Sequence, residues 1–175
     1  LGFFQSKINY EEYLSAYSLA MEKAPEEEKA MGKIYITYLS SPLSRNEDWR
    51  KMDALANRTD NIFPRILSLK MMLPHRVDSV YLKTVIAKLP PNLDYFGPYA
   101  YVLRGQAREK LNQISEAQLD YQKALALDPE CAVALWYQYD LFTKLHRGTE
   151  AKETLKNLIS LHPNYIPALE QSSNF

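Results

Sequence analysis

The sequence predicts an all-α protein built from antiparallel helical hairpins. Apolar residues recur at three- and four-residue spacing along most of the chain, which is the pattern of helices with one buried face. Prolines and short polar stretches divide these segments, and such short connections force neighbouring helices to run antiparallel. No segment shows the alternation of apolar and polar residues that indicates a strand.

The first half of the chain contains a series of helical segments separated by prolines. Pro25, Pro42 and Pro74 mark the breaks, because a proline lacks the backbone N–H and clashes with the preceding turn of a helix. Pro90 and Pro91 close the series, and a loop follows up to Pro98. The apolar stripes in this half cover residues 10–24, 30–39, 49–56, 61–73 and 76–89.

The second half gives a clearer helical pattern. Ser115 followed by Gln118 fits a capping box, in which the side chains and backbone groups satisfy each other at the start of a helix. Thr149 is the predicted N-cap of a later helix. The predicted helices are 98–111, 115–127, 132–146 and 149–161, with a last one starting near 166.

This half also repeats itself at a fixed period. Pro129 and Pro163 each follow an aliphatic helix end, and they are 34 residues apart. Each is followed by an alanine-bearing helix start, at 131–135 and at 165–169. One such hairpin cannot bury its apolar face alone, so neighbouring hairpins are expected to stack into a solenoid.

The period and the residues resemble the tetratricopeptide repeat (TPR) family. The resemblance is clear over 98–165. In the first repeat it is carried by Gly105, Ala117, Ala124, Tyr101, Tyr121 and Pro129. In the second repeat it is carried by Leu135, Phe142, Ala151, Leu155, Leu158 and Pro163.

Three positions depart from the family pattern. Arg104 stands where a leucine is usual, Arg108 where an aromatic residue is usual, and Tyr139 where a small residue is usual. The large Tyr139 side chain is expected to widen the packing of its hairpin.

The resemblance also implies a domain organisation for the whole chain. Residues 1–25 resemble the end of a first hairpin whose start would precede Leu1, and residues 26–92 have hairpin lengths but few of the family's residues. We therefore expect one TPR-like helical domain over 1–175, a right-handed superhelix of hairpins. Its expected parts are 1–25, degenerate hairpins at 26–58 and 59–92, repeats at 98–131 and 132–165, and the start of a capping helix at 166–175.

Composition excludes several classes of function. The chain has 175 residues with 21 Lys and Arg against 21 Asp and Glu and no basic block, which argues against direct nucleic-acid binding. No apolar run reaches the ~20 residues of a membrane helix, so no membrane insertion is expected. The sequence therefore predicts a soluble protein, in the cytoplasm or the periplasm, and leaves the compartment open.

The chemistry-bearing residues predict a non-enzymatic protein. Cys131 is the only cysteine and lies far in sequence from His75, so the close set of ligands that a zinc site needs is absent. HExxH, GxSxG, CxxC and glycine-rich phosphate motifs are absent as well. We expect no catalytic residue, no metal and no cofactor.

The resemblance implies a binding site on the concave face, which the first helix of each hairpin lines. Trp136, Tyr99 and Tyr137 are the expected anchors, because large aromatic side chains carry much of the energy at interfaces. Asp140 would repel a carboxylate, so the carboxy-terminal tail of a heat-shock protein is an unfavourable ligand. Alternatively, these aromatic residues pack against the helix that starts at Ile166. The predicted groove residues are Tyr99, Val102, Leu103, Gln106, Trp136, Tyr137, Asp140 and Lys144.

The function predicted from this pattern is a protein–protein interaction scaffold or adaptor that binds a partner peptide or helix. A bacterial secretion, pilus or envelope assembly is one setting for such a scaffold. The alternative is a sensory or regulatory TPR domain of a larger protein, such as a transcription regulator. The sequence leaves the oligomeric state open.

Overall fold

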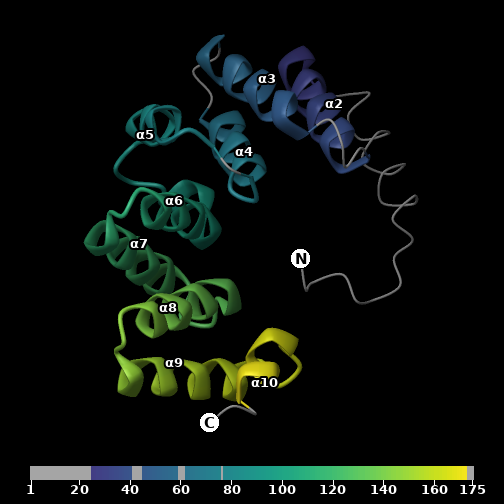
Figure 1. The fold of residues 1–175 in the computed structure, drawn as a ribbon. Helices are drawn as coiled ribbons and strands as arrows, with labels where there is room; N and C mark the ends of the chain where they lie inside the picture. Colours follow the sequence, from purple (N-terminus) through teal and green to yellow (C-terminus); the bar gives the residue numbers. More distant parts are fainter. Residues whose placement is uncertain (1–24, 41–44, 59–61, 76, 173–175) are drawn as a thin grey trace. The chain divides into compact units, whose positions relative to one another are not determined.

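The computed structural model describes residues 25–40, 45–58, 62–75 and 77–172, and the regular elements in these ranges are all helices (Figure 1). The prediction of an all-α fold is confirmed for this part of the chain. The chain forms two compact units, residues 1–76 and 77–175, which are described separately below. The predicted hairpin end at 1–25 lies outside the described residues except for Pro25.

The first unit contains three described helices, α2 (Glu26–Ser40), α3 (Arg45–Arg58) and α4 (Phe63–Met72), and α3 packs against both of the others. Polar contacts tie α3 to α4: the Ser68 hydroxyl donates to the Trp49 carbonyl at 3.0 Å, and Arg65 donates to Asn57 at 2.7 Å. The buried apolar side chains between the helices are Trp49, Met52, Leu55, Ile66, Leu69 and Met72.

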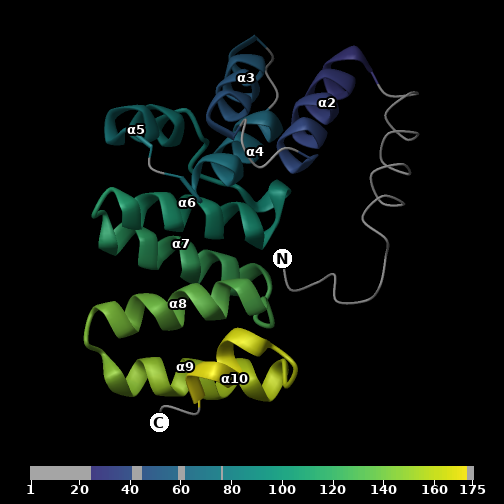
Figure 2. The same ribbon diagram turned by 45° about the vertical axis from the view of Figure 1, so that its right-hand side comes forward.

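The second unit contains the two clear repeats. Helix α6 packs against α7, α7 against α8, and α8 against α9, and Figure 2 shows these helices stacked in that order. The predicted boundaries of these four helices agree with the structure to within two residues. The elements are α5 (Ser79–Ala87), the 3₁₀ turn η2 (Asp94–Phe96), α6 (Pro98–Lys110), α7 (Ile114–Leu127), α8 (Ala132–Lys144), α9 (Gly148–Leu161) and α10 (Ile166–Ser172).

The turns inside the two repeats have the same geometry. Asn112 and His146, which are 34 residues apart, adopt left-handed conformations with φ of 58° and 57°. The N–H of the next residue bonds to the carbonyl five positions back, at 2.8 Å for Gln113 and 2.9 Å for Arg147. These are the bonds of a Schellman motif, which ends one helix tightly and leads directly into the next.

The tight turns explain why both predicted N-caps are wrong. Helix α7 begins at Ile114 and α9 at Gly148, so Ser115 and Thr149 already lie inside the first turn. The N-cap positions are held by Gln113 and Arg147, whose side chains make no capping hydrogen bond. Sequence reasoning favoured the hydroxyl residues, but the Schellman turn fixes the helix start one residue earlier.

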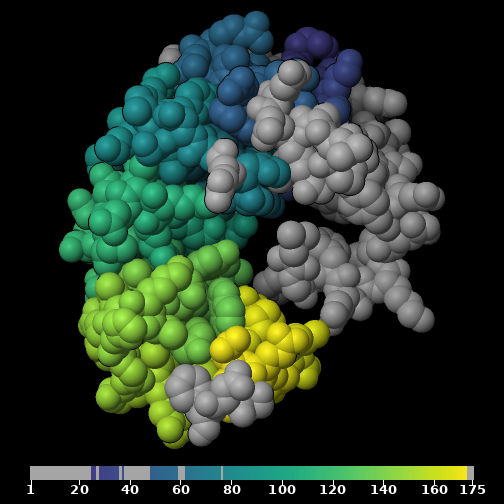
Figure 3. Space-filling model, viewed as in Figure 1, coloured from purple at the N-terminus to yellow at the C-terminus, as the bar shows by residue number. Residues whose placement is uncertain are grey.

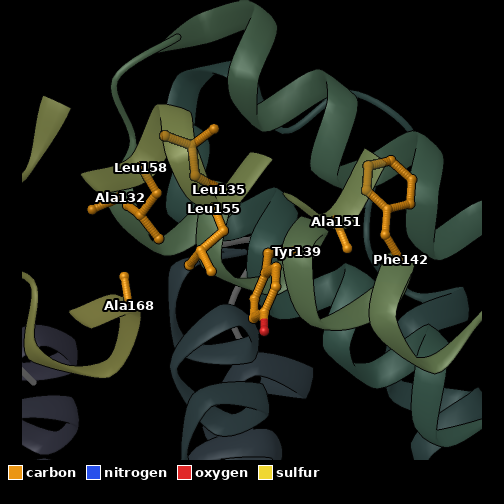
Figure 4. Close-up of a cluster of buried hydrophobic side chains, with 8 residues drawn as sticks. All are labelled: Ala132, Leu135, Tyr139, Phe142, Ala151, Leu155, Leu158 and Ala168. Atoms are coloured by element: carbon orange, nitrogen blue, oxygen red, sulfur yellow. The ribbon is translucent and has the colours of Figure 1, made fainter. Parts of the chain in front are cut away.

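A small-to-large exchange distinguishes the cores of the two repeats. In the first repeat Gly105 lies against the ring of Tyr121, which is fully buried. One period later, Tyr139 replaces the glycine and Leu155 replaces the tyrosine, and both are buried in one cluster between α8 and α9 (Figure 4). The added volume of Tyr139 is therefore offset by the smaller Leu155 on the facing helix.

Arg104, the residue at the usual leucine position, is buried and fully paired. Its guanidinium donates to both oxygens of Asp120, with distances of 2.8 to 3.2 Å, and the two side chains are 3% and 0% exposed. It also donates to the carbonyls of Pro90 at 2.7 Å and Pro91 at 3.1 Å. Arg108 approaches the same Asp120 at 2.6 Å. A polar network thus replaces an apolar contact and fixes the 90–91 loop to α6 and α7.

The expected organisation of 26–92 stays a prediction. Helices α2 and α3 fall within 26–58, whereas α4 and α5 fall within 59–92 but belong to different compact units. Within the second unit, the space-filling view of Figure 3 shows the α10 residues (yellow) lying against green residues of the second repeat.

Candidate functional site

The predicted groove residues lie on α6 and α8, the first helices of the two repeats. Tyr99 is 40% exposed. Gln106, Trp136, Tyr137 and Asp140 are partly exposed, and Lys144 is exposed. These six residues present side-chain surface that a partner could contact.

Val102 and Leu103 do not present such surface. They are 0% and 3% exposed, so the prediction that they line an open groove is wrong for these two residues. Helix α6 is contacted by α5, α7 and α8, and its middle turn is consequently covered on most sides. A single helical stripe from the sequence cannot show that a helix in the interior of a stack buries more than one face.

Trp136 connects the candidate surface with the buried cluster of the second repeat. Its ring lies 5.5 Å from the ring of Tyr139 and 6.0 Å from the ring of Tyr165, which precedes α10. The predicted alternative, packing towards the helix that starts at Ile166, therefore describes part of the Trp136 surface, and the remainder is exposed. Tyr165 was not among the predicted residues, although its aromatic character directly before the last predicted helix was the available signal.

A polar network lies beside these aromatic rings. The Tyr121 hydroxyl donates to one oxygen of Glu109, and Lys144 donates to the other at 2.9 Å. Lys144 also pairs with Asp140 at 2.5 Å. Desolvation opposes the charge on Lys144, but these two carboxylates outweigh it and raise the lysine pKa, so Lys144 stays protonated at neutral pH.

Tyr137 contacts both the aromatic rings and the polar network of the candidate surface. Its ring stacks on Tyr121 with 6.1 Å between centroids. Burial raises the pKa of Tyr137, and the nearby Tyr99, Asp140 and Glu109 raise it further. Tyr137 is therefore a neutral hydroxyl next to two carboxylates, and it lies near Tyr99 of the preceding first helix.

The described residues show no arrangement for metal chemistry or membrane insertion. Within them, no group of three or more His, Cys, Asp or Glu side chains is placed to hold a metal ion. None of the helices in the described ranges is long and apolar enough to cross a membrane. The surface formed by Tyr99, Trp136, Tyr137, Asp140 and Lys144 offers aromatic contact area and hydrogen-bonding groups, which suit recognition of another molecule.

Comparison with known protein families gives a match, which covers α6 and α7. Residues 98–131 match the tetratricopeptide repeat family. The match covers one repeat length, and repeats of this family form protein–protein interaction scaffolds that are typically non-catalytic.

A solved structure supports the same fold. A crystal structure of MamA is 20% identical and covers 71% of this chain and 72% of that chain, with a TM-score of 0.57. A second crystal structure, of MamA protein, is 19% identical and covers 90% of this chain and 78% of that one, with a TM-score of 0.43. No curated protein matches the chain. The fold is the all-α TPR-like fold.

Proposed function

We propose that the second unit binds a peptide segment or helix of a partner protein across the exposed side chains of α6 and α8. The observation that carries this proposal is the aromatic row that successive first helices contribute, with Tyr99 from α6 and Trp136 and Tyr137 from α8. Tyr165 extends the row at the start of α10. Tyrosine and tryptophan bury large areas with few rotatable bonds, so they are effective anchors in interfaces.

The charges beside the row define the preferred partner. Glu109 and Asp140 carry two negative charges against the single positive charge of Lys144, and Lys144 is already paired with both. A ligand carboxylate would meet net negative charge here and would find Lys144 already paired. The surface therefore favours apolar and neutral or basic side chains, and it disfavours a terminal carboxylate.

The partial burial of Trp136 guides the choice of variants. Replacing Trp136 removes packing against Tyr139 and Tyr165, so it would change stability as well as binding. Tyr99→Ala and Tyr137→Ala are sharper probes, and Leu119→Ala, which truncates an exposed apolar side chain of α7, is the matched control. Truncating a true anchor typically weakens binding by ~2 kcal/mol or more.

The experiment identifies a partner by affinity capture from the source cells with the wild-type chain, and then measures its affinity for the purified variants. Circular dichroism establishes that each variant is folded. We expect both tyrosine variants to lose affinity while Leu119→Ala retains it. Equal affinity for all folded variants would place binding elsewhere. A secretion, pilus or envelope setting stays a prediction that the identity of the partner would decide.

A further inference from the structure

A separate pocket lies in the second unit, outside the aromatic row. The loop between α5 and α6 and the last turns of α7 border an open, shallow pocket of about 380 Å³. Pro91 and Asp94 line it from the loop, Tyr101 from α6, and Lys123 and Leu127 from α7. None of these residues belongs to the proposed groove, so the pocket calls for its own explanation.

The loop side of the pocket is held in place by buried groups. Arg104 binds the carbonyls of Pro90 and Pro91, as described above. The Tyr101 hydroxyl accepts from the Leu93 N–H at 2.9 Å and donates to Asp94 at 2.8 Å. A pocket fixed in this way loses little conformational freedom when a ligand binds, which favours affinity.

One wall of the pocket combines a cation with apolar surface. The Lys123 ammonium lies 5.7 Å from the centre of the Tyr101 ring and, within the described residues, makes no ion pair. Leu127 follows one helical turn later and is 43% exposed. Such a half-buried lysine beside an exposed leucine suits a ligand that has a carboxylate and an apolar group a short distance apart.

The opposite wall accepts hydrogen bonds. Asp94 receives the Tyr101 hydroxyl on one oxygen and the Asn92 amide on the other, and both Asp94 and Asn92 are exposed. The remaining lone pairs of Asp94 can accept from peptide N–H groups. The negative charge of Asp94 and the presence of a single lysine disfavour a phosphate group, which carries more charge than a carboxylate.

We propose that this pocket binds an extended acidic–apolar segment of a partner protein, with its carboxylate on Lys123 and its apolar side chain on the exposed Leu127. Four helical residues from Lys123 to Leu127 rise about 6 Å. Two residues of an extended peptide rise about 6.6 Å, and their side chains point to the same face. The spacing therefore selects an acidic and an apolar residue separated by one residue.

The test uses blocked peptides of defined sequence and the intact chain. The probes are acetyl-Ser-Glu-Ser-Phe-Ser-amide and the reversed acetyl-Ser-Phe-Ser-Glu-Ser-amide, with lysine in place of glutamate as the charge control. Binding is measured at up to millimolar peptide, the range of a single short-segment contact, by nitrogen-15 chemical-shift mapping. Lys123→Glu is the test variant, and Lys156→Glu, an exposed lysine of α9, is the matched control.

We expect at least one glutamate peptide to shift the amides of 93–94 and 123–127 saturably, with at least tenfold weaker binding to Lys123→Glu and unchanged binding to Lys156→Glu. The lysine peptides should bind at least tenfold more weakly than their glutamate counterparts. The absence of saturable shifts at these amides overturns the proposal. So does a shift that Lys123→Glu leaves unchanged, or one that inorganic phosphate alone reproduces, because the pocket would then not recognise this peptide chemistry.

Discussion

The substitution Gly105→Ala is the sharpest test of how the first repeat is packed. A Cβ atom added at Gly105 would lie 2.5 Å from Cε1 and 2.9 Å from Cδ1 of Tyr121. The ring of Tyr121 is fully buried, stacks on Tyr137 and donates its hydroxyl to Glu109. Gly105→Ala therefore forces either α6 or the Tyr121 ring to move.

The expected cost follows from three contributions. Overpacking in a well-packed core typically costs about 1–3 kcal/mol. Loss of the Tyr121–Glu109 hydrogen bond, which involves a charged acceptor, adds about 1.5–3 kcal/mol if the ring moves away. The better helix propensity of alanine returns about 1 kcal/mol. We expect Gly105→Ala to lower the free energy of unfolding by roughly 1.5–5 kcal/mol.

Urea denaturation followed by far-UV circular dichroism measures this change. Gly148→Ala is the matched control, because a Cβ at Gly148 meets no atom within 4 Å and the backbone there does not require glycine. The control should be neutral or slightly stabilising. The packing argument is refuted if Gly105→Ala is as stable as the wild type or more stable.

Three further predictions follow from the second unit. Arg104→Leu restores the usual residue of the family pattern but removes one partner of a buried ion pair. It should lower the free energy of unfolding, measured by urea denaturation, by about 3 kcal/mol. A change within ~0.5 kcal/mol would show that the remaining contact from Arg108 suffices for Asp120. Tyr139→Ala also approaches the family pattern, yet it should cost about 3 kcal/mol, because Leu155 is too small to fill the space; a neutral or stabilising effect would refute the volume exchange. Burial, and then Glu109, raises the pKa of Tyr121, so the folded chain keeps a proton that the unfolded chain releases near pH 10. The free energy of unfolding should therefore be constant below about pH 10 and fall above it. Denaturation at a series of pH values should show a less steep fall for Tyr121→Phe than for the wild type. Identical slopes for the two chains would contradict the assignment of this pH dependence to Tyr121.

The fold of the second unit was largely predictable because local signals agree there. Helical stripes, prolines at a 34-residue period and short connections all indicate the same hairpins. The helix starts at 114 and 148 were missed by one residue, because left-handed turns at Asn112 and His146 compete with side-chain capping.

The compensations in the core were not predictable from single positions. Arg104 and Tyr139 look like departures from the family pattern until their partners are known. Asp120 and Leu155 supply the matching charge and volume from the facing helices. Pairs of this kind depend on which residues face each other across two helices, which one sequence does not specify at the level of side chains.

The candidate site was predictable in composition but only partly in exposure. The family resemblance placed Tyr99, Trp136 and Tyr137 on the concave face, and the structure leaves each of them partly exposed. The same resemblance also selected Val102 and Leu103, which neighbouring helices cover. Tyr165 joined the aromatic row through the start of α10, a contact that depends on how the last helix folds back on α9.

The most direct test of the proposed binding surface is site-specific photo-cross-linking. A photoreactive phenylalanine is placed at Tyr99 in one chain and at Leu119 in another, because both positions are similarly exposed, at 40% and 49%, on different helices of the same repeat. After irradiation in the source cells, we predict a specific protein adduct at position 99 and none at position 119. An adduct at position 119 alone, or at neither position, would contradict the assignment of this face as the partner-binding site.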